Sequence, residues 1–189
     1  MIYASLGSVQ NTKHEIFHCI AAACEKLDVQ LVISHGGGMN PEAVQQLPGS
    51  PLVVEYAPQI EVISKARLTI THGGLNTVLD SLSNGVPLVA IPITYEQPGT
   101  AARIKWTGTG EVIALTDLSI PNLQAAIVRV LTEDFYLENA MRLKQAICQA
   151  GGVKRAADIV EQAVKSGYPV RTRLKSSATN SVKQIIKFE

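Results

Sequence analysis

Short apolar runs alternate with longer amphipathic segments along most of the chain. The apolar runs predict six β-strands, at Ile2–Leu6, Gln30–Ser34, Leu52–Glu55, Leu68–Thr71, Pro87–Ile91 and Glu111–Leu115. The amphipathic segments predict helices at about Lys13–Leu27, Ile60–Ser64, residues 75–84, Pro121–Thr132, Asp134–Ala150 and Val153–Ser166. Strands that alternate with helices are typical of βα units, in which a parallel sheet is covered by helices on both faces.

This order of elements predicts an α/β fold with a Rossmann-like, doubly wound parallel sheet, because crossovers between parallel strands are right-handed. Such sheets bind ligands beyond the carboxyl ends of their strands. We therefore expect a ligand site in the turns that follow Leu6, Ser34, Thr71 and Ile91.

The chain has 189 residues, which suffices for one well-buried domain and is short for two. No run approaches about 18 uninterrupted apolar residues, and no basic-then-apolar leader precedes Tyr3, so a membrane span and a secretory signal are not expected. Cys19, Cys24 and Cys148 lack metal-site spacing and are odd in number, which predicts reduced thiols. These features favour a cytoplasmic protein.

Charge divides the chain into two parts. Residues 1–167 carry 12 basic and 15 acidic side chains, which disfavours nucleic-acid binding. Residues 168–189 carry five basic side chains and one acidic side chain. We therefore expect a ligand-binding domain over residues 1–167 and a basic C-terminal tail over residues 168–189, which is either solvated or in contact with a partner or an anionic membrane.

His14-Glu15-Ile16-Phe17-His18 matches the HExxH pattern of zinc hydrolases. Two histidines one helical turn apart can bind zinc while the glutamate activates water. A catalytic zinc needs a third protein ligand, however, and no recognisable one follows. The match is interpreted as accidental.

The glycine-rich segment His35-Gly36-Gly37-Gly38 follows a predicted strand. A phosphate loop is one interpretation, but Met39-Asn40-Pro41 predicts a further loop where a helix N-terminus is needed. We expect a flexible connector. The patterns of P-loop enzymes and nicotinamide dehydrogenases do not occur.

The segment Thr71–Thr77, Thr-His-Gly-Gly-Leu-Asn-Thr, joins a buried strand directly to a helix. Glycines allow close approach of a ligand, and free N–H groups in the first helical turn attract phosphate. His72, Asn76 and Thr77 carry further hydrogen-bond donors. The segment predicts a diphosphate site, with an ordinary strand-to-helix turn as the alternative.

Other residues around this segment complete a nucleotide-sugar pattern. The ring of Tyr56 can stack on a base, and Gln59 can reach a base or a ribose edge. Asp80 lies one helical turn beyond the diphosphate segment, where a carboxylate can accept hydrogen bonds from ribose hydroxyls. Glu96 and Gln97 place an acceptor beside an amide, which suits sugar hydroxyls.

Residues 56–103 resemble the donor signature of UDP-dependent glycosyltransferases of the two-domain GT-B type, family 1. The match includes His72–Thr77, Gly85-Val86-Pro87 and Glu96-Gln97-Pro98. The run His72–Leu82, continued by Gln97–Arg103, is similar to the zeaxanthin glucosyltransferase branch. The resemblance covers about residues 1–167 and implies the C-terminal, donor-binding half of a GT-B enzyme.

The resemblance implies a UDP-sugar site. Tyr56 would stack on uracil, Ala57 and Gln59 would lie beside the base and the ribose, and Asp80 would bind the ribose. The diphosphate would contact Ser8, His72, Gly74, Asn76 and Thr77, and the sugar would contact Glu96 and Gln97. Asp80 stands where Glu is usual, and Glu96 replaces the commoner Asp. Gln97 is associated with glucose in this family.

The resemblance also implies a mechanism without a metal or another cofactor. Helix N–H groups and His72 would stabilise the charge that develops on the β-phosphate. In the family the acceptor hydroxyl loses its proton to a histidine, usually oriented by Asp, in the N-terminal domain. We expect this chain to open at the first strand of the C-terminal domain and to lack that base, since His14, His18 and His35 do not match it.

The implied activity is inverting transfer of glucose from UDP-glucose to a hydroxyl of a lipophilic acceptor such as a carotenoid. An excised domain, a truncated gene or a donor-binding subunit of a split glycosyltransferase would each account for the missing half; the eukaryotic split N-acetylglucosaminyltransferase is a precedent. A separate acceptor-domain chain would then be the partner, and membrane contact would occur only through that partner or the acceptor. A non-catalytic nucleotide-binding module, a different α/β enzyme that ignores UDP and a zinc hydrolase are the alternatives.

Overall fold

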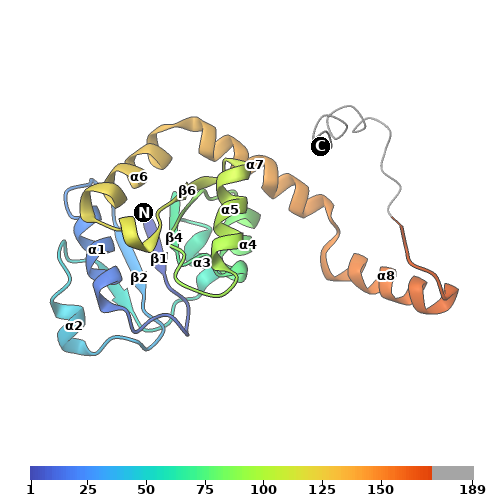
Figure 1. The fold of residues 1–189 in the computed structure, drawn as a ribbon, viewed down its shortest axis with the longest axis horizontal. Helices are drawn as coiled ribbons and strands as arrows, with labels where there is room; N and C mark the ends of the chain where they lie inside the picture. The colour runs from blue at the N-terminus through green and yellow to red at the C-terminus, as the bar shows by residue number, and fades with distance from the viewer. Residues whose placement is uncertain (172–189) are drawn as a thin grey trace. The chain divides into compact units, whose positions relative to one another are not determined.

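The computed structural model describes residues 1–171, and its centre is a parallel β-sheet. The sheet contains β1 (Ile2–Ser5), β2 (Leu31–Ser34), β3 (Leu52–Val54), β4 (Leu68–Thr71), β5 (Leu88–Ala90) and β6 (Gly110–Val112). The strands lie in the order β3-β2-β1-β4-β5-β6 (Figure 1). The direction in which the chain adds strands reverses between β1 and β4, as in a doubly wound sheet. The predicted α/β, Rossmann-like fold is confirmed.

Helices cover both faces of the sheet (Figure 1). They are α1 (His14–Cys24), α2 (Pro41–Gln45), α3 (Gln59–Ile63), α4 (Leu75–Asn84), α5 (Gln97–Thr107), α6 (Ile120–Thr132) and α7 (Asp134–Gln149). Side chains of α1 and α6 share one buried cluster with the sheet. Side chains of α4, α5 and α7 form a second cluster against β5, and α3 packs in a third against β1 and β2.

Alternating side chains of β1 divide between the two faces. Ile2 and Ala4 pack in the cluster of α1 and α6, whereas Tyr3 packs with Ile63 of α3. All four residues of β1 are buried, as are those of β2 and β4. A parallel sheet that is covered twice requires this burial, which explains why its strands are apolar runs in the sequence.

Two helices in the sheet domain were not predicted. α2 begins at Pro41, and its N-cap Asn40 accepts a hydrogen bond from the backbone N–H of Ala43 at 2.8 Å, so the expected loop is shorter than predicted. α5 begins with Gln97-Pro98-Gly99, residues that normally indicate a turn. Proline is nevertheless favourable in the first turn of a helix, where its missing N–H costs nothing.

The sixth strand ends earlier than its apolar pattern indicates. β6 stops at Val112, and Leu115–Asp117 forms a single 3₁₀ turn, η1, instead of continuing the strand.

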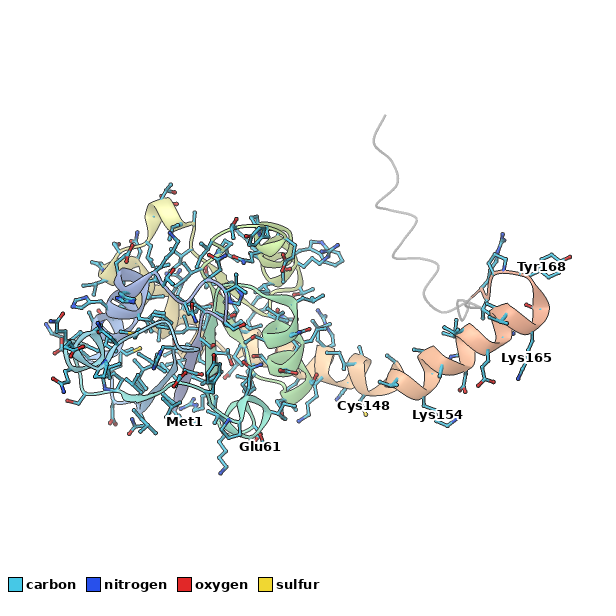
Figure 2. The ribbon with its side chains drawn as sticks, turned by 90° about the horizontal axis from the view of Figure 1, so that it is seen from below. Met1, Glu61, Cys148, Lys154, Lys165 and Tyr168 are labelled. Carbon is cyan, nitrogen blue, oxygen red and sulfur yellow. The ribbon has the colours of Figure 1, made fainter. Side chains whose placement is uncertain are left out.

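Residues 1–149 form one compact unit, and a second unit begins at Ala150. Within the second unit, α8 (Gly152–Ser166) carries i,i+4 ion pairs at both ends, Lys154–Asp158 at 3.7 Å and Lys165–Glu161 at 3.1 Å. Figure 2 labels Lys154 and Lys165 on this helix. Most of the predicted basic tail, from residue 172 onward, lies outside the described residues. None of the helices in residues 1–171 combines the length and apolarity that a membrane crossing needs.

Glu111 of β6 joins α6 and α7 to the edge of the sheet. Its Oε1 accepts a hydrogen bond from the Tyr136 hydroxyl at 2.5 Å and lies 3.4 Å from the Arg129 Nε. Tyr136 is buried, whereas the Arg129 side chain is 47% exposed. Burial and the bond to Glu111 raise the pKa of Tyr136 to about 12, so the hydroxyl remains a donor at neutral pH.

Replacing Tyr136 by Phe removes the buried donor to Glu111, and we expect the free energy of unfolding to fall by about 1–2 kcal/mol. The matched variant Arg129→Met removes the exposed partner of the same carboxylate and should cost less than about 0.5 kcal/mol. Urea denaturation of the two variants measures both values. Equal losses would mean that Tyr136 does not anchor α7 through its hydroxyl.

Candidate functional site

The turns after β1 and β4 meet at the point where the strand order reverses. They line a cavity of about 420 Å³ at the carboxyl edge of the sheet, formed by Gly7, Ser8, Val9, His72, Gly74, Leu75, Asn76, Thr77 and Glu96. Open α/β sheets bind ligands at this position. The cavity lies at the edge of the sheet where the sequence predicts a ligand site.

A second cavity of about 300 Å³ shares Gly7 and Ser8 with the first. Its lining also includes the ends of β1 and β2 and the start of α3, through Tyr3, Ser5, Ser34, Gly36, Tyr56, Ala57 and Gln59. The two cavities together are lined by all the predicted site residues except Asp80 and Gln97. The shared residues make the two cavities neighbours, and we refer to them together as the hollow; Tyr56 lines the smaller cavity and Glu96 the larger.

No Lys or Arg is among the described residues that line the larger cavity. Attraction for an anion must therefore come from uncharged donors: the backbone N–H groups at the start of α4, His72, and the side chains of Ser8, Asn76 and Thr77. α4 begins at Leu75, directly behind Gly74, so the first-turn N–H groups open toward the cavity. This arrangement suits phosphate oxygens, which accept hydrogen bonds from helix N-termini.

The imidazole of His72 occupies a slot between two glycines. A Cβ atom on Gly74 would lie 2.6 Å from the His72 Nε2, and one on Gly7 would lie 3.0 Å from its Cε1. Gly7 also has a φ of +72°, which disfavours any side chain there. Gly74 has an extended backbone that any residue adopts, so its constraint is the contact with the ring.

Burial lowers the pKa of His72, while a hydrogen bond to the Ser5 backbone and the nearby Glu96 carboxylate act in the opposite direction. The imidazole is therefore largely neutral at pH 7. A neutral imidazole still carries one N–H, so His72 can donate a hydrogen bond to a phosphate oxygen.

Gln59, Thr77 and Asp80 form a hydrogen-bonded group where α3 and α4 meet. The Gln59 Nε2 donates to the Asp80 Oδ2 at 2.7 Å, and the Thr77 hydroxyl donates to the Gln59 Oε1 at 3.4 Å. Asp80 does not line either cavity, but Gln59 links it to residues that do. The structure thus brings Gln59 and Asp80, which the sequence predicts for the ribose, together with Thr77, which it predicts for the diphosphate.

Gln97 is 3% exposed, and its side chain organises the loop between β5 and α5. Its Oε1 accepts hydrogen bonds from the backbone N–H groups of Ile93 at 2.8 Å and Thr94 at 2.9 Å. The loop also holds Tyr95 in a left-handed conformation with φ +56° and places Glu96 at the cavity. Of the predicted sugar pair, Glu96 lines the larger cavity and Gln97 does not. The side-chain amide oxygen of Gln97 instead holds the loop through its hydrogen bonds to Ile93 and Thr94.

Several cavity residues were not predicted from the sequence. Tyr3, Ser5 and Ser34 are buried residues of β1 and β2 that line the smaller cavity. The available signal was the presence of hydroxyl side chains in strands that are otherwise fully apolar. Val9 and Leu75 add exposed apolar surface to the larger cavity.

The HExxH segment has a structural contact that its pattern does not indicate. His14 and His18 are exposed on α1, and the His14 Nε2 lies 2.6 Å from the Gly38 carbonyl oxygen. Within residues 1–171, no three His, Cys, Asp or Glu side chains group closely enough to hold a metal ion.

The glycine segment after β2 is held more firmly than a flexible connector. The side chains of Asn11 and Tyr56 donate to the Gly36 carbonyl, and the Gly36 N–H donates to the Glu55 carbonyl at 2.7 Å. The Gly38 N–H donates to the His35 carbonyl at 3.1 Å, so it too is occupied within the loop. The segment therefore offers few free N–H groups to a phosphate.

The model of one protein family, "UDP-glucoronosyl and UDP-glucosyl transferase", matches residues 1–150. The chain belongs to this family. The predicted resemblance is confirmed, and the family is one of glycosyltransferases. The part of the chain that matches contains both cavities and every predicted site residue.

Individual relatives match over a similar range. A zeaxanthin glucosyltransferase of Pantoea ananas is 37% identical over 171 residues, which make up 89% of this chain and 39% of that protein. The NDP-glycosyltransferase YjiC of Bacillus subtilis is 32% identical over 165 residues, 87% of this chain and 42% of that protein. The chain thus spans about 40% of the length of these relatives.

The solved structure of CalG4, the calicheamicin glycosyltransferase, superposes on this fold with a TM-score of 0.80. It is 30% identical and matches 89% of this chain and 44% of that chain. The six-stranded Rossmann-like domain is therefore the fold found in GT-B glycosyltransferases.

The lowered pKa of His72 predicts how the site affects stability. Because the folded state disfavours the protonated imidazole, unfolding takes up a proton as the pH falls below about 6.5. The contribution of His72 is fully present above that pH and decreases below it. We expect His72→Gln to lose less stability than the wild type between pH 7 and pH 5, as measured by urea denaturation at each pH. Parallel curves for the two proteins would contradict a buried, neutral His72.

Proposed function

We propose that residues 1–167 bind the UDP-sugar donor of an inverting glycosyltransferase. The observation that carries this proposal is the pair of neighbouring cavities at the β1–β4 reversal: the exposed ring of Tyr56 lines one of them, and His72 and the N-terminus of α4 line the other. A nucleoside diphosphate needs both features, because its base stacks on an aromatic ring and its diphosphate accepts from N–H donors.

Each part of the donor has candidate partners along this hollow. Uracil stacks on Tyr56, which is 66% exposed, beside Ala57 and Gln59. The ribose hydroxyls are assigned to Asp80, whose carboxylate accepts a hydrogen bond from Gln59 at 2.7 Å. The proposed partners of the diphosphate are Ser8, His72, Gly74, Asn76 and Thr77. Glu96 is the proposed partner of the sugar, and Gln97 contributes by holding the loop that presents Glu96.

Departure of UDP places negative charge on the β-phosphate, and the start of α4 with His72 stabilises that charge without a metal. The acceptor hydroxyl must also lose a proton to a base. We assign that base to an acceptor-binding domain, since the matched relatives are more than twice as long as this chain. Residues 1–189 alone should therefore transfer little sugar.

Glucose is the proposed sugar and a lipophilic alcohol such as a carotenoid the proposed acceptor, on the strength of the similarity to zeaxanthin glucosyltransferases. The acceptor domain is either another part of the same polypeptide or a separate chain of a split enzyme. The protein is proposed to be cytoplasmic and to meet a membrane only through its acceptor or a partner.

Isothermal titration of the purified chain with UDP and UDP-glucose, without added metal, tests the proposal. We expect saturable one-to-one binding of both. Gly74→Ala should weaken UDP binding by about tenfold or more, because the new methyl group displaces the His72 imidazole and removes a hydrogen bond to a charged group. The backbone at Gly74 accepts Ala, so the fold should be retained.

Gly99→Ala is the matched control, because a Cβ atom at Gly99 would meet no atom within 4 Å. This variant should bind UDP like the wild type. Equal affinities of the Gly74 and Gly99 variants for UDP would show that His72 does not contribute to UDP binding. A folded wild-type protein without affinity for UDP would refute the donor-binding function, and binding without transfer in the presence of an acceptor domain would favour a non-catalytic nucleotide-binding module.

A further inference from the structure

Tyr3 is a polar side chain in the middle of the sheet that no contact of the proposed donor requires. It is 1% exposed and lies on the face of β1 that packs against α3, together with Val32, Ile63 and Val86. A phenylalanine would fill the same apolar volume. The hydroxyl therefore needs an explanation of its own, because a buried Tyr O–H normally has a hydrogen-bond partner.

The Tyr3 hydroxyl donates to the Gln59 Oε1 at 3.4 Å. The Thr77 hydroxyl donates to the same oxygen, also at 3.4 Å. The Asp80 carboxylate only accepts hydrogen bonds, so the Gln59 atom 2.7 Å from it is the NH₂ nitrogen, and the atom that faces the two hydroxyls is the amide oxygen. The Gln59 amide is thus held in one orientation, with its NH₂ group turned away from Tyr3.

In this orientation the Gln59 Nε2 donates to the Asp80 Oδ2 at 2.7 Å, the shortest link of the chain. The backbone of Asp80 is also held, because the side-chain amide of Asn84 donates a hydrogen bond to the Asp80 backbone carbonyl at 2.9 Å. Within residues 1–171, the other carboxylate oxygen, Oδ1, accepts no hydrogen bond from the protein. The link through Gln59 therefore fixes the rotation of the Asp80 carboxylate and leaves one oxygen free for a ligand hydroxyl.

Electrostatics keep this chain of hydrogen bonds in a single state. Burial is the main cause that raises the pKa of Tyr3, and the negative charge of Asp80 raises it further. Hydrogen bonds with Ser34 and Ser5 lower this pKa and so act in the opposite direction. The phenol consequently stays protonated at neutral pH and remains a donor. The Tyr3 hydroxyl on β1 therefore orients the Gln59 amide on α3, and this amide in turn orients the Asp80 carboxylate on α4.

We propose that Tyr3 is a positioning residue that acts through Gln59 and Asp80 to make the site selective for the ribose hydroxyls of its nucleotide. This inference rests on the proposed donor-binding function and extends it to a residue to which no contact with the ribose is assigned. Selectivity for ribose over deoxyribose then depends on a hydroxyl buried in the first strand.

The test compares UDP with 2′-deoxy-UDP and 3′-deoxy-UDP by isothermal titration. The wild type should bind at least one deoxy analogue more weakly than UDP. Tyr3→Phe should weaken UDP binding by about threefold to tenfold and leave the affinity for that analogue nearly unchanged, because only the ribose contact loses its alignment. The ratio of dissociation constants, that of the deoxy analogue divided by that of UDP, is therefore smaller in the variant than in the wild type.

Two further variants separate positioning from general damage. Tyr136→Phe removes a buried hydroxyl from α7 and should leave the ratio unchanged. In the Gln59→Leu background, the Tyr3→Phe change should not narrow the ratio further, since the relay is already broken.

An unchanged ratio in Tyr3→Phe, or an equal loss of affinity for UDP and for the analogue, would overturn the positioning role while leaving donor binding intact. Failure of the wild type to bind UDP at all would instead overturn the proposed function. A wild type that binds UDP and both analogues equally would show that Asp80 does not select ribose hydroxyls, and the inference would then be wrong.

Discussion

The site depends on the hydrogen-bonded pairing of β1 with β4. These strands are more than sixty residues apart in sequence, yet their register places Ser5 opposite Thr71. The pairing brings the turn after β1 beside the turn after β4, so that Gly7 and Gly74 enclose the ring of His72. If either strand slipped by one residue, every side chain would change face and this slot would be lost.

The same pairing explains how a cavity without Lys or Arg can suit an anion. Both turns sit at the carboxyl edge of the sheet, and α4 starts from that edge with its N–H groups directed outward. The favourable potential comes from backbone groups that are held in place by the fold. His72 adds a hydrogen-bond donor, and its burial favours the neutral imidazole. The negative charge of Glu96 acts in the opposite direction, because it attracts the protonated imidazole. A ligand phosphate in the cavity would strengthen that attraction.

The sequence predicts the sheet well because burial on two faces demands apolar runs, and all six strands were placed within a few residues. The predicted site residues also gather at one edge, since their order in the chain follows the order of the βα turns. α5 was missed because Pro98 and Gly99 normally mark a turn, and its buried face is built partly from Gln97 and Thr100. Local patterns carry no information about such polar contacts.

The roles of Gln97 and Tyr3 were harder to predict for the same reason. Gln97 was expected to contact a sugar, but its buried carbonyl holds the N–H groups of Ile93 and Thr94 in the loop that presents Glu96. Tyr3 was read as one more apolar strand residue, although its hydroxyl reaches Gln59. Both roles arise from the direction of a hydrogen bond across elements, which spacing along the chain does not encode. All residues that line the two cavities belong to the unit of residues 1–149, so the proposed donor site requires side chains from this one compact unit alone.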